Sequence, residues 1–317
     1  MDPREGGAVA VGITLFRPSL EQIARVAARA RGAAGPVLAF ENGGVSAEAA
    51  ATLAASGVRL LSGGANLGIA AALNGLAAAA REMGARHLLL LDQDALPAPG
   101  MVEALAAARA RLAADGLAAA VIGPRPLAGP GHKVPGFPAH PGVARRGSLV
   151  PVGFLATSGS LVDLAAFAAV GPFRTDYFID GVDLEWCYRA WARGYGCWLE
   201  EATGLHHHVG SGTIRGPFGL AMARQPLFRM ATYLRNAVYG LRLPHLPARW
   251  KLRQAAYLPV QIGLYWADSG FRPRVLLRLL EALRDGLAGR LGPPRDLPKT
   301  LPGTSPAPAT PPSETRP

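Results

Sequence analysis

Cysteine is scarce in this sequence. Only Cys187 and Cys197 occur among its 317 residues, and they lack the spacing of zinc ligands. The sequence therefore indicates neither a disulfide framework nor a structural zinc site. We expect the protein to work in a reducing compartment, the cytoplasm.

Long apolar runs are also missing. Residues 1–20 lack the basic start and apolar stretch of a signal peptide. The longest late apolar stretch, residues 257–267, contains Pro259 and Gln261 and is too short to cross a bilayer. We therefore expect neither a leader peptide nor a transmembrane helix.

Acidic residues are outnumbered, because 22 Asp and Glu stand against 33 Lys and Arg, a formal net charge of +11. Such an excess favours partners that carry phosphate: nucleotides, nucleic acids or anionic lipid surfaces. The basic residues form no nucleic-acid recognition motif, so a nucleic-acid partner is not expected. Most of the excess lies late in the chain, interleaved with Leu, Tyr and Trp, at Arg242, Arg249, Lys251, Arg253, Arg272, Arg274, Arg278, Arg284 and Arg290. This pattern predicts either a solvated basic helix face or a peripheral contact with the cytoplasmic membrane face.

What the sequence does contain is a regular alternation of short apolar runs and helical patterns. With 50% hydrophobic and 17% charged residues, the chain fits a folded globular protein. Strands are predicted at 8–14, 36–40, 58–61 and 87–91, and helices at 20–31, 47–55 and 69–83. This alternation predicts an α/β fold with a mostly parallel sheet between helices. Later patterns predict a helix at 101–114, a strand at 118–122, a long loop at 124–147 and a helix at 161–170.

The sharpest local motif is an apolar strand, residues 88–91, that runs into Asp92-Gln93-Asp94. In open parallel sheets, ligands gather at the carboxyl ends of the strands. If the chain stays extended here, Asp92 and Asp94 point the same way and could hold Mg or Mn through carboxylate oxygens. The structural alternative is an ordinary acidic turn after a strand.

A second acidic motif, Asp180-Gly181-Val182-Asp183-Leu184-Glu185, places three carboxylates within six residues at a predicted helix start. Such a cluster suits general-base chemistry. The structural alternative is a capping box, with Asp180 as N-cap and Asp183 as its partner. A third motif, three consecutive histidines at 206–208, could supply an imidazole to the same cation or be purely structural.

Taken in order, these segments resemble the rhamnosyltransferase branch of the family 2 glycosyltransferases, over roughly residues 8–240. The similar segments are Thr14-Leu15-Phe16-Arg17-Pro18, Glu41-Asn42-Gly43-Gly44, Asn66-Leu67-Gly68 with Asn74, Asp92-Gln93-Asp94, Thr157-Ser158-Gly159-Ser160-Leu161, Phe178 to Trp186, His207 with Gly210, and Tyr233-Leu234-Arg235-Asn236. The chain departs from the family at three positions: Leu15 replaces an aromatic residue, Glu41 an Asp, and Gly181 an acidic residue.

The resemblance implies a GT-A fold, which is a mostly parallel, Rossmann-like sheet sandwiched by helices, with a helical C-terminal appendage. It implies a catalytic, nucleotide-sugar-binding domain at 1–216. The spacing of Arg and aromatic residues predicts a basic, aromatic helical region at 217–291, and the content of Pro, Thr and Ser predicts a disordered tail at 292–317. The implied reaction is an inverting, metal-dependent transfer of a deoxysugar, L-rhamnose from TDP-rhamnose, to a glycolipid or cell-surface polysaccharide precursor.

The resemblance also assigns roles to single residues. It implies that the donor is contacted by Thr14, Glu41, Asn66, Gly68, Asn74, Asp92 and Arg235. It implies that Asp94 and His207 bind the Mg or Mn ion. Either Asp180 or Asp183 is the base, with a slight preference for Asp180. Alternatives are another donor, such as a UDP-hexose or a galactofuranosyl donor, and a non-catalytic relative. A nucleotidyltransferase would need a Gly-rich basic loop after the first strand, where only Arg17 is basic.

Overall fold

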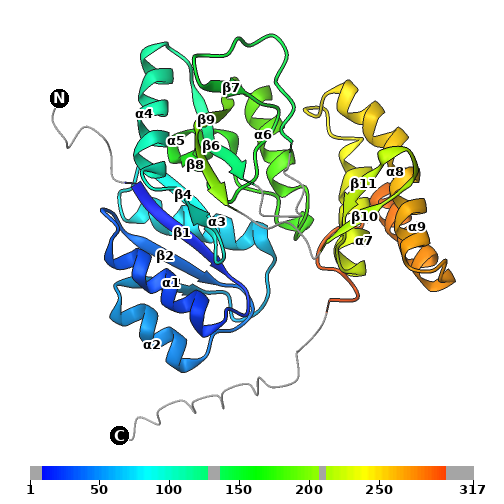
Figure 1. The fold of residues 1–317 in the computed structure, drawn as a ribbon, viewed down its shortest axis with the longest axis horizontal. Coiled ribbons are helices and arrows are strands. Elements are labelled where there is room, and N and C mark those ends of the chain that lie inside the picture. Colours follow the sequence, from blue (N-terminus) through cyan, green and yellow to red (C-terminus); the bar gives the residue numbers. More distant parts are fainter. Residues whose placement is uncertain (1–8, 128–135, 207–211, 298–317) are drawn as a thin grey trace, which may run out of the picture.

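The computed structural model describes residues 9–127, 136–206 and 212–297. Its centre is a mixed sheet in the order β3-β2-β1-β4-β8-β6-β9-β5, with β7 also paired to β9 (Figure 1). The strands are β1 (Val9–Leu15), β2 (Val37–Glu41), β3 (Val58–Ser62), β4 (His87–Asp92), β5 (Leu96–Pro97), β6 (Ala119–Leu127), β7 (Leu149–Pro151), β8 (Leu161–Asp163) and β9 (Gly196–His206). The first four are parallel neighbours, whereas β8 is antiparallel to both β4 and β6. The prediction of a mostly parallel sheet between helices is confirmed.

Helices cover both faces of the sheet, because β4 carries apolar side chains on both of its faces. Leu88 and Leu90 belong to one buried cluster, with α3 (Ile69–Glu82), α5 (Leu164–Val170) and α6 (Val182–Ala192). Leu89 and Leu91 belong to the opposite cluster, with α1 (Leu20–Arg31), α2 (Ala47–Ala55) and α4 (Met101–Ala114). Because successive strand residues point to opposite faces, a fully apolar β4 marks a strand that is buried on both sides.

Two predicted segments need correction. The helix predicted at 161–170 begins only at Leu164, because residues 161–163 form β8 in the middle of the sheet. The Asp163 side chain then accepts the Ala166 N–H and caps α5. The loop predicted at 124–147 is partly ordered, since β6 continues to Leu127, and Ala139 and Arg146 form isolated bridges.

The last part of the described chain has a core of its own. It consists of the hairpin β10 (Thr213–Arg215) and β11 (Ala221–Ala223) with α7 (Leu227–Gly240), α8 (Ala248–Asp268) and α9 (Pro273–Ala288), at one end of the molecule (Figure 1). Met230, Leu234, Leu258 and Leu279 are buried together in it. None of the helices that the structure describes combines the length and apolar character needed to cross a membrane.

Candidate active site

Polar residues gather where the four parallel strands end. The registers align Thr14 with Asp92, and Glu41 with Ser62, so these side chains lie along one edge of the sheet. The Thr14 hydroxyl donates to Asp92 Oδ1 at 3.4 Å. The structure therefore brings Thr14, Glu41 and Asp92 to the edge where ligands bind in this fold class.

The loop before α3 is built by side-chain amides. Asn66 Oδ1 accepts the Gly68 N–H at 3.0 Å, and Asn42 Oδ1 accepts the Leu67 N–H at 2.8 Å. Gly68 has φ of 84°, and a Cβ there would lie 2.6 Å from the Phe178 carbonyl oxygen. Only glycine fits this left-handed, crowded position, which ties the start of α3 to the segment before α6.

Asn74 lies farther along α3 and does not face the edge. Its Nδ2 donates to the Phe173 carbonyl at 2.9 Å, and its Oδ1 accepts the Phe173 N–H at 2.9 Å. Each polar atom has a hydrogen-bond partner within the protein, and the contact between Asn74 and the donor stays a prediction.

A cavity of about 300 Å³ opens beside the strand edge. Asp92, Asp180 and Asp183 all line it, although 88 residues of chain separate Asp92 from Asp180. The backbone N–H of Asp92 donates to Ser158 Oγ at 3.1 Å, which connects β4 to the Thr157–Ser160 side of the same cavity. The two acidic motifs of the sequence therefore converge on one hollow. We call it the carboxylate cavity.

Asp180 does not cap α6. Its own φ is 64°, and the N-cap is Gly181, which makes no side-chain cap bond. The Asp180 carboxylate instead faces Arg229 of α7, with Nη2 to Oδ1 at 2.5 Å and Nε to Oδ2 at 3.3 Å. Asn236 holds the strained turn by donating to the Ile179 and Asp180 carbonyls, each at 2.9 Å. The capping-box interpretation is wrong, because the side chain is drawn to the guanidinium.

Asp183, in the first turn of α6, has no such cation bound to it among the described residues. Burial raises the pKa of its carboxyl to about 6, the neighbouring charges of Asp180 and Asp92 add to the rise, and the hydrogen bond from the Leu184 N–H opposes it. A carboxylate with this pKa can take up a proton close to neutral pH, which suits a general base.

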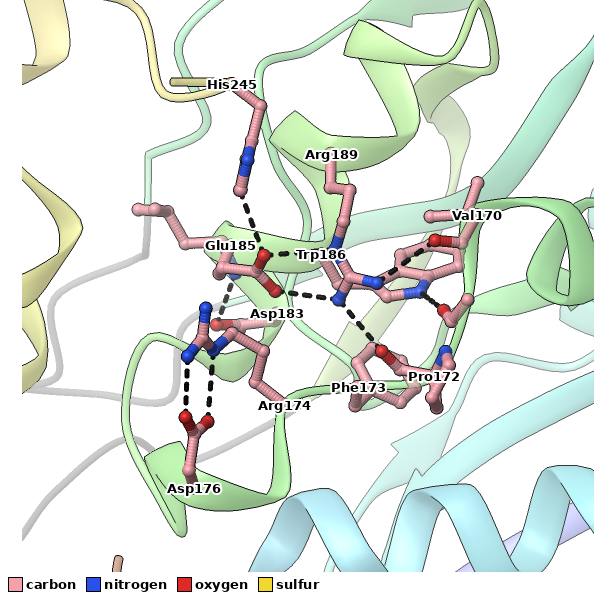
Figure 2. Close-up of polar contacts among 12 residues, drawn as sticks. Val170, Pro172, Phe173, Arg174, Asp176, Asp183, Glu185, Trp186, Arg189 and His245 are labelled. Atoms are coloured by element: carbon pink, nitrogen blue, oxygen red, sulfur yellow. Dashed lines mark hydrogen bonds and ion pairs between the residues drawn. The ribbon is translucent and has the colours of Figure 1, made fainter. Parts of the chain in front are cut away.

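A buried network fixes α6 in place behind Asp183 (Figure 2). Glu185, 1% exposed, receives Arg189 Nε at 3.0 Å and Nη2 at 2.8 Å, and His245 Nε2 lies 2.9 Å away, without hydrogen-bond alignment. Arg189 also donates to the Val170 and Pro172 carbonyls at 3.0 and 2.8 Å. Burial alone would raise the pKa of Glu185, but His245 and Arg189 outweigh it and lower that pKa.

Arg235 lies away from the carboxylate cavity. Its guanidinium donates to the Asn236 side chain at 3.1 Å and to the Gly292 and Tyr177 carbonyls at 2.7 and 3.3 Å. The side chain is buried, and it lines a different, smaller cavity near Asp285. The structure gives Arg235 contacts that join α7 to the segments beside it, and its contact with the donor stays a prediction.

The structure does not test the predicted metal pair of Asp94 and His207, because only Asp94 lies within the described residues. β4 ends at Asp92, so Gln93 and Asp94 form a turn, and the extended geometry assumed for Asp92 and Asp94 does not hold. Asp94 is absent from the lining of the carboxylate cavity, and His207 lies outside the described residues. Within the described ranges, His, Cys, Asp and Glu form no group of three fit for a metal ion.

The sequence analysis did not single out Gln225, just before α7, or Arg229, in its first turn, and both line the carboxylate cavity. Arg229, Tyr233 and Asn236 share one face of α7, at the spacing i, i+4 and i+7. The motif at Tyr233 and Asn236 could therefore have been followed one turn upstream to Arg229. Its partner Asp180 could not have been found this way, since 49 residues separate them.

Comparison with known proteins agrees with this geometry. No family model matches the chain. A dTDP-rhamnosyl transferase from Shigella flexneri, RfbF, is 26% identical over 136 residues, which are 43% of this chain and 46% of the relative. The match thus spans less than half of that relative's length.

Solved structures resemble the whole fold. TarS of S. aureus, residues 1–349 with UDP-GlcNAc, matches at a TM-score of 0.54 and 11% identity over 88% of this chain and 80% of that one. GalNAc-T7 with UDP, GalNAc and Mn²⁺ matches at a TM-score of 0.52 and 12% identity, over 79% of this chain and 54% of that one. The chain has the GT-A glycosyltransferase fold. Within that class it resembles the rhamnosyltransferases of family 2, as its motifs and the Shigella relative both indicate.

Proposed function

We propose that the protein is a glycosyltransferase that moves a sugar from a nucleoside diphosphate to an acceptor hydroxyl, with inversion at the anomeric carbon. The observation that carries this proposal is the meeting of Asp92, Asp180, Asp183 and Arg229 around one cavity at the carboxyl edge of a GT-A sheet. The strand edge would take the nucleotide, and the cavity would take the sugar and its diphosphate.

Asp183 is our candidate for the base. Asp180 is paired with Arg229, whereas the raised pKa of Asp183 keeps its carboxylate basic near neutral pH. In the proposed step, Asp183 accepts the proton of the acceptor hydroxyl while the hydroxyl oxygen attacks the anomeric carbon. The bond from that carbon to the diphosphate oxygen breaks, and the electron pair leaves with the diphosphate. This choice reverses the slight preference for Asp180 drawn from the sequence.

Arg229 supplies positive charge where the diphosphate departs. Three carboxylates line the cavity, and the Arg229 guanidinium faces them. A preorganised cation in a cleft stabilises a leaving group more than one in water. Asp180 then serves to position Arg229. The Mn²⁺ in the GalNAc-T7 structure supports including Mg or Mn in any assay.

The donor we propose is TDP-rhamnose, supported by the Shigella relative, which is a dTDP-rhamnosyl transferase. The UDP and UDP-GlcNAc in the two solved relatives support a UDP-sugar as the second candidate. For the acceptor we propose a glycolipid or polysaccharide precursor, handled at the cytoplasmic face of a membrane.

A donor screen tests this function. The protein is incubated with TDP-rhamnose, UDP-hexoses or UDP-galactofuranose, each together with methyl glycosides as acceptors and with or without Mn²⁺, and nucleoside diphosphate release is measured. We expect release from TDP-rhamnose, reduced about 100-fold or more in Asp183→Asn, because general-base catalysis contributes on this scale. Glu21→Gln, on the exposed face of α1, serves as the control. Equal release by wild type and Asp183→Asn would remove Asp183 from the role of base.

A further inference from the structure

A second cavity, of about 270 Å³, adjoins the first on the far side of Asp183. Asp180, Asp183 and Phe154 line both cavities, so the two hollows meet at the carboxylates. The walls of the second cavity come from α6, α7 and α8, and it is therefore built largely by the C-terminal region. Its volume approaches the lower end of small-molecule sites, about 300 Å³, which suits a single ring.

Aromatic side chains and planar polar groups line this second cavity together. The aromatic members are Phe154, Tyr177, Tyr233 and Trp250, and the polar members include Glu185, Asn236, Arg253 and Gln254. A sugar ring has apolar C–H faces that stack on aromatic rings and hydroxyls that need hydrogen-bond partners around its rim. The lining offers both kinds of contact.

The polar groups are held in place by the protein. Gln254 is buried, and its Nε2 donates to the Tyr233 hydroxyl at 2.8 Å. Gln261 Nε2 lies 3.3 Å from the same hydroxyl and holds it from the other side. Gln254 lines the cavity, and its Nε2 is engaged by Tyr233, so the carboxamide oxygen is the group it offers to a hydroxyl.

An alkyl chain fits this lining less well than a sugar. It would cover the polar atoms of Gln254 and Arg253 without replacing their hydrogen bonds to water, at a cost of about 1–3 kcal/mol for each buried group. Hydroxyl groups avoid that cost.

We propose that this second cavity binds a saccharide unit that carries the acceptor hydroxyl. The inference rests on the proposed function, and it assigns recognition of the acceptor to α7 and α8. A ring seated against Trp250 places a hydroxyl beside Asp183, at the point where both cavities meet.

Saturation-transfer NMR on the full chain tests this, with methyl glycosides of rhamnose, galactose, glucose and N-acetylglucosamine as probes and octanol as the alkyl probe. TDP and UDP binding is measured in parallel by calorimetry. Leu184 is a half-buried residue in the lining of this cavity, and Leu184→Trp should fill the cavity. The matched control is Leu184→Met, which keeps the cavity open. We expect transfer to at least one methyl glycoside, a loss of about 10-fold or more in Leu184→Trp, and retention in Leu184→Met.

Each other outcome is decisive. A glycoside signal that persists in Leu184→Trp, with circular dichroism showing a folded variant, places the saccharide elsewhere and overturns the inference. A signal from octanol alone overturns the saccharide class. Nucleotide binding without any glycoside binding also overturns the inference but leaves the proposed function standing, whereas failure to bind TDP or UDP counts against the proposed function itself.

Discussion

At the scale of single residues, Asp183 carries a charge that the fold holds at a cost. Its pKa is raised from 3.8 to about 6, so the folded protein binds this proton more tightly than the unfolded chain does. Stability therefore falls as the pH rises from about 4 to about 6, and the loss persists at higher pH. Residues kept for chemistry commonly lower stability in this way.

Asp183→Asn should therefore stabilise the protein above pH 6 while removing transfer. We expect the free energy of unfolding to rise by about 1–2 kcal/mol at pH 7.5, which is less than the full shift implies because the side chain is only half-buried. Urea denaturation at pH 7.5 and pH 4 measures this. No gain should appear at pH 4, where wild-type Asp183 is protonated in the fold. A variant that is less stable at pH 7.5 contradicts the assigned pKa.

Arg229 sets the pH range in which Asp183 works. Burial lowers the pKa of Arg229, but the charges of Asp180, Asp92 and Asp183 outweigh it and raise that pKa. Since this attraction is mutual, the Arg229 charge favours the ionised form of Asp183. We expect kcat/KM to rise with pH through a midpoint near 6 in wild type. In Arg229→Gln the midpoint should move up by about one unit, because a cation has been lost near the base. The measured quantity is the midpoint of the pH profile of kcat/KM, which does not depend on how much activity remains. The control variant Arg25→Gln, on α1, should have the wild-type midpoint.

Individual residues also show what the sequence could predict about the site. Asp92 was found because it ends an apolar strand, and ligands gather at the carboxyl ends of the strands in an open parallel sheet. Its place on the edge of the sheet follows from the order of the strands. Asp180 was found as a member of an acidic cluster, but its environment was missed. A positive φ and a pairing with Arg229 depend on how α7 docks, and local patterns carry no information about docking.

At the scale of elements, α6 is fixed by charges rather than by a cap. Gly181 provides no side-chain cap, so the first turn relies on Glu185, Arg189 and His245 behind it (Figure 2). This arrangement joins α6 to α5 on one side and to the connection between α7 and α8 on the other. The orientation of Asp183 depends on it.

Glu185→Gln should loosen this element. Removing one member of a buried ion pair leaves the other uncompensated, and we expect the free energy of unfolding to fall by about 3 kcal/mol at pH 7.5. The fold lowers the pKa of Glu185. The ionised side chain therefore stabilises the fold at pH values above its unfolded pKa, and this stabilisation is lost as the pH falls. Denaturation measured from pH 7.5 down to pH 4 should therefore show the gap between variant and wild type narrowing. Glu21→Gln, which breaks the exposed pair with Arg25, should cost less than 1 kcal/mol.

The elements themselves were predictable where periodicity was strong. The helices α1, α2 and α4 have the predicted bounds, because each pairs a regular apolar face with a clear end. The failure at β8 has a physical reason: Leu161, Val162 and Asp163 precede α5 without a break, and only pairing with β4 and β6 makes them a strand. Tertiary pairing overrode the local pattern.

At the scale of the whole molecule, the excess positive charge and an exposed apolar face occur together on α8. Trp250, Gln254, Leu258 and Gln261 face inward, which turns the opposite side outward. That outward side is apolar from Leu252 to Ala267, and its exposed members are Leu252, Ala255, Ala256, Pro259, Val260, Gly263 and Ala267. Arg249 and Arg253 are exposed at its N-terminal end. A helix face of this kind fits an anionic lipid surface, through apolar contact along the face and charge at one end.

We therefore expect the protein to sediment with vesicles that contain phosphatidylserine and to remain in the supernatant with phosphatidylcholine alone. Binding should weaken when the salt concentration is raised from about 50 to about 300 mM, because salt screens the attraction between the basic side chains and the anionic lipids. Leu252→Glu places an anion on the face at a side chain that is 73% exposed, so it should reduce sedimentation without affecting the fold. The matched control is Leu20→Glu, at the 60% exposed first residue of α1, which should sediment like wild type. If Leu252→Glu and Leu20→Glu behave alike, α8 is not the surface that meets the lipid. If wild type stays out of the phosphatidylserine pellet at low salt, the acceptor must reach Asp183 without help from a membrane.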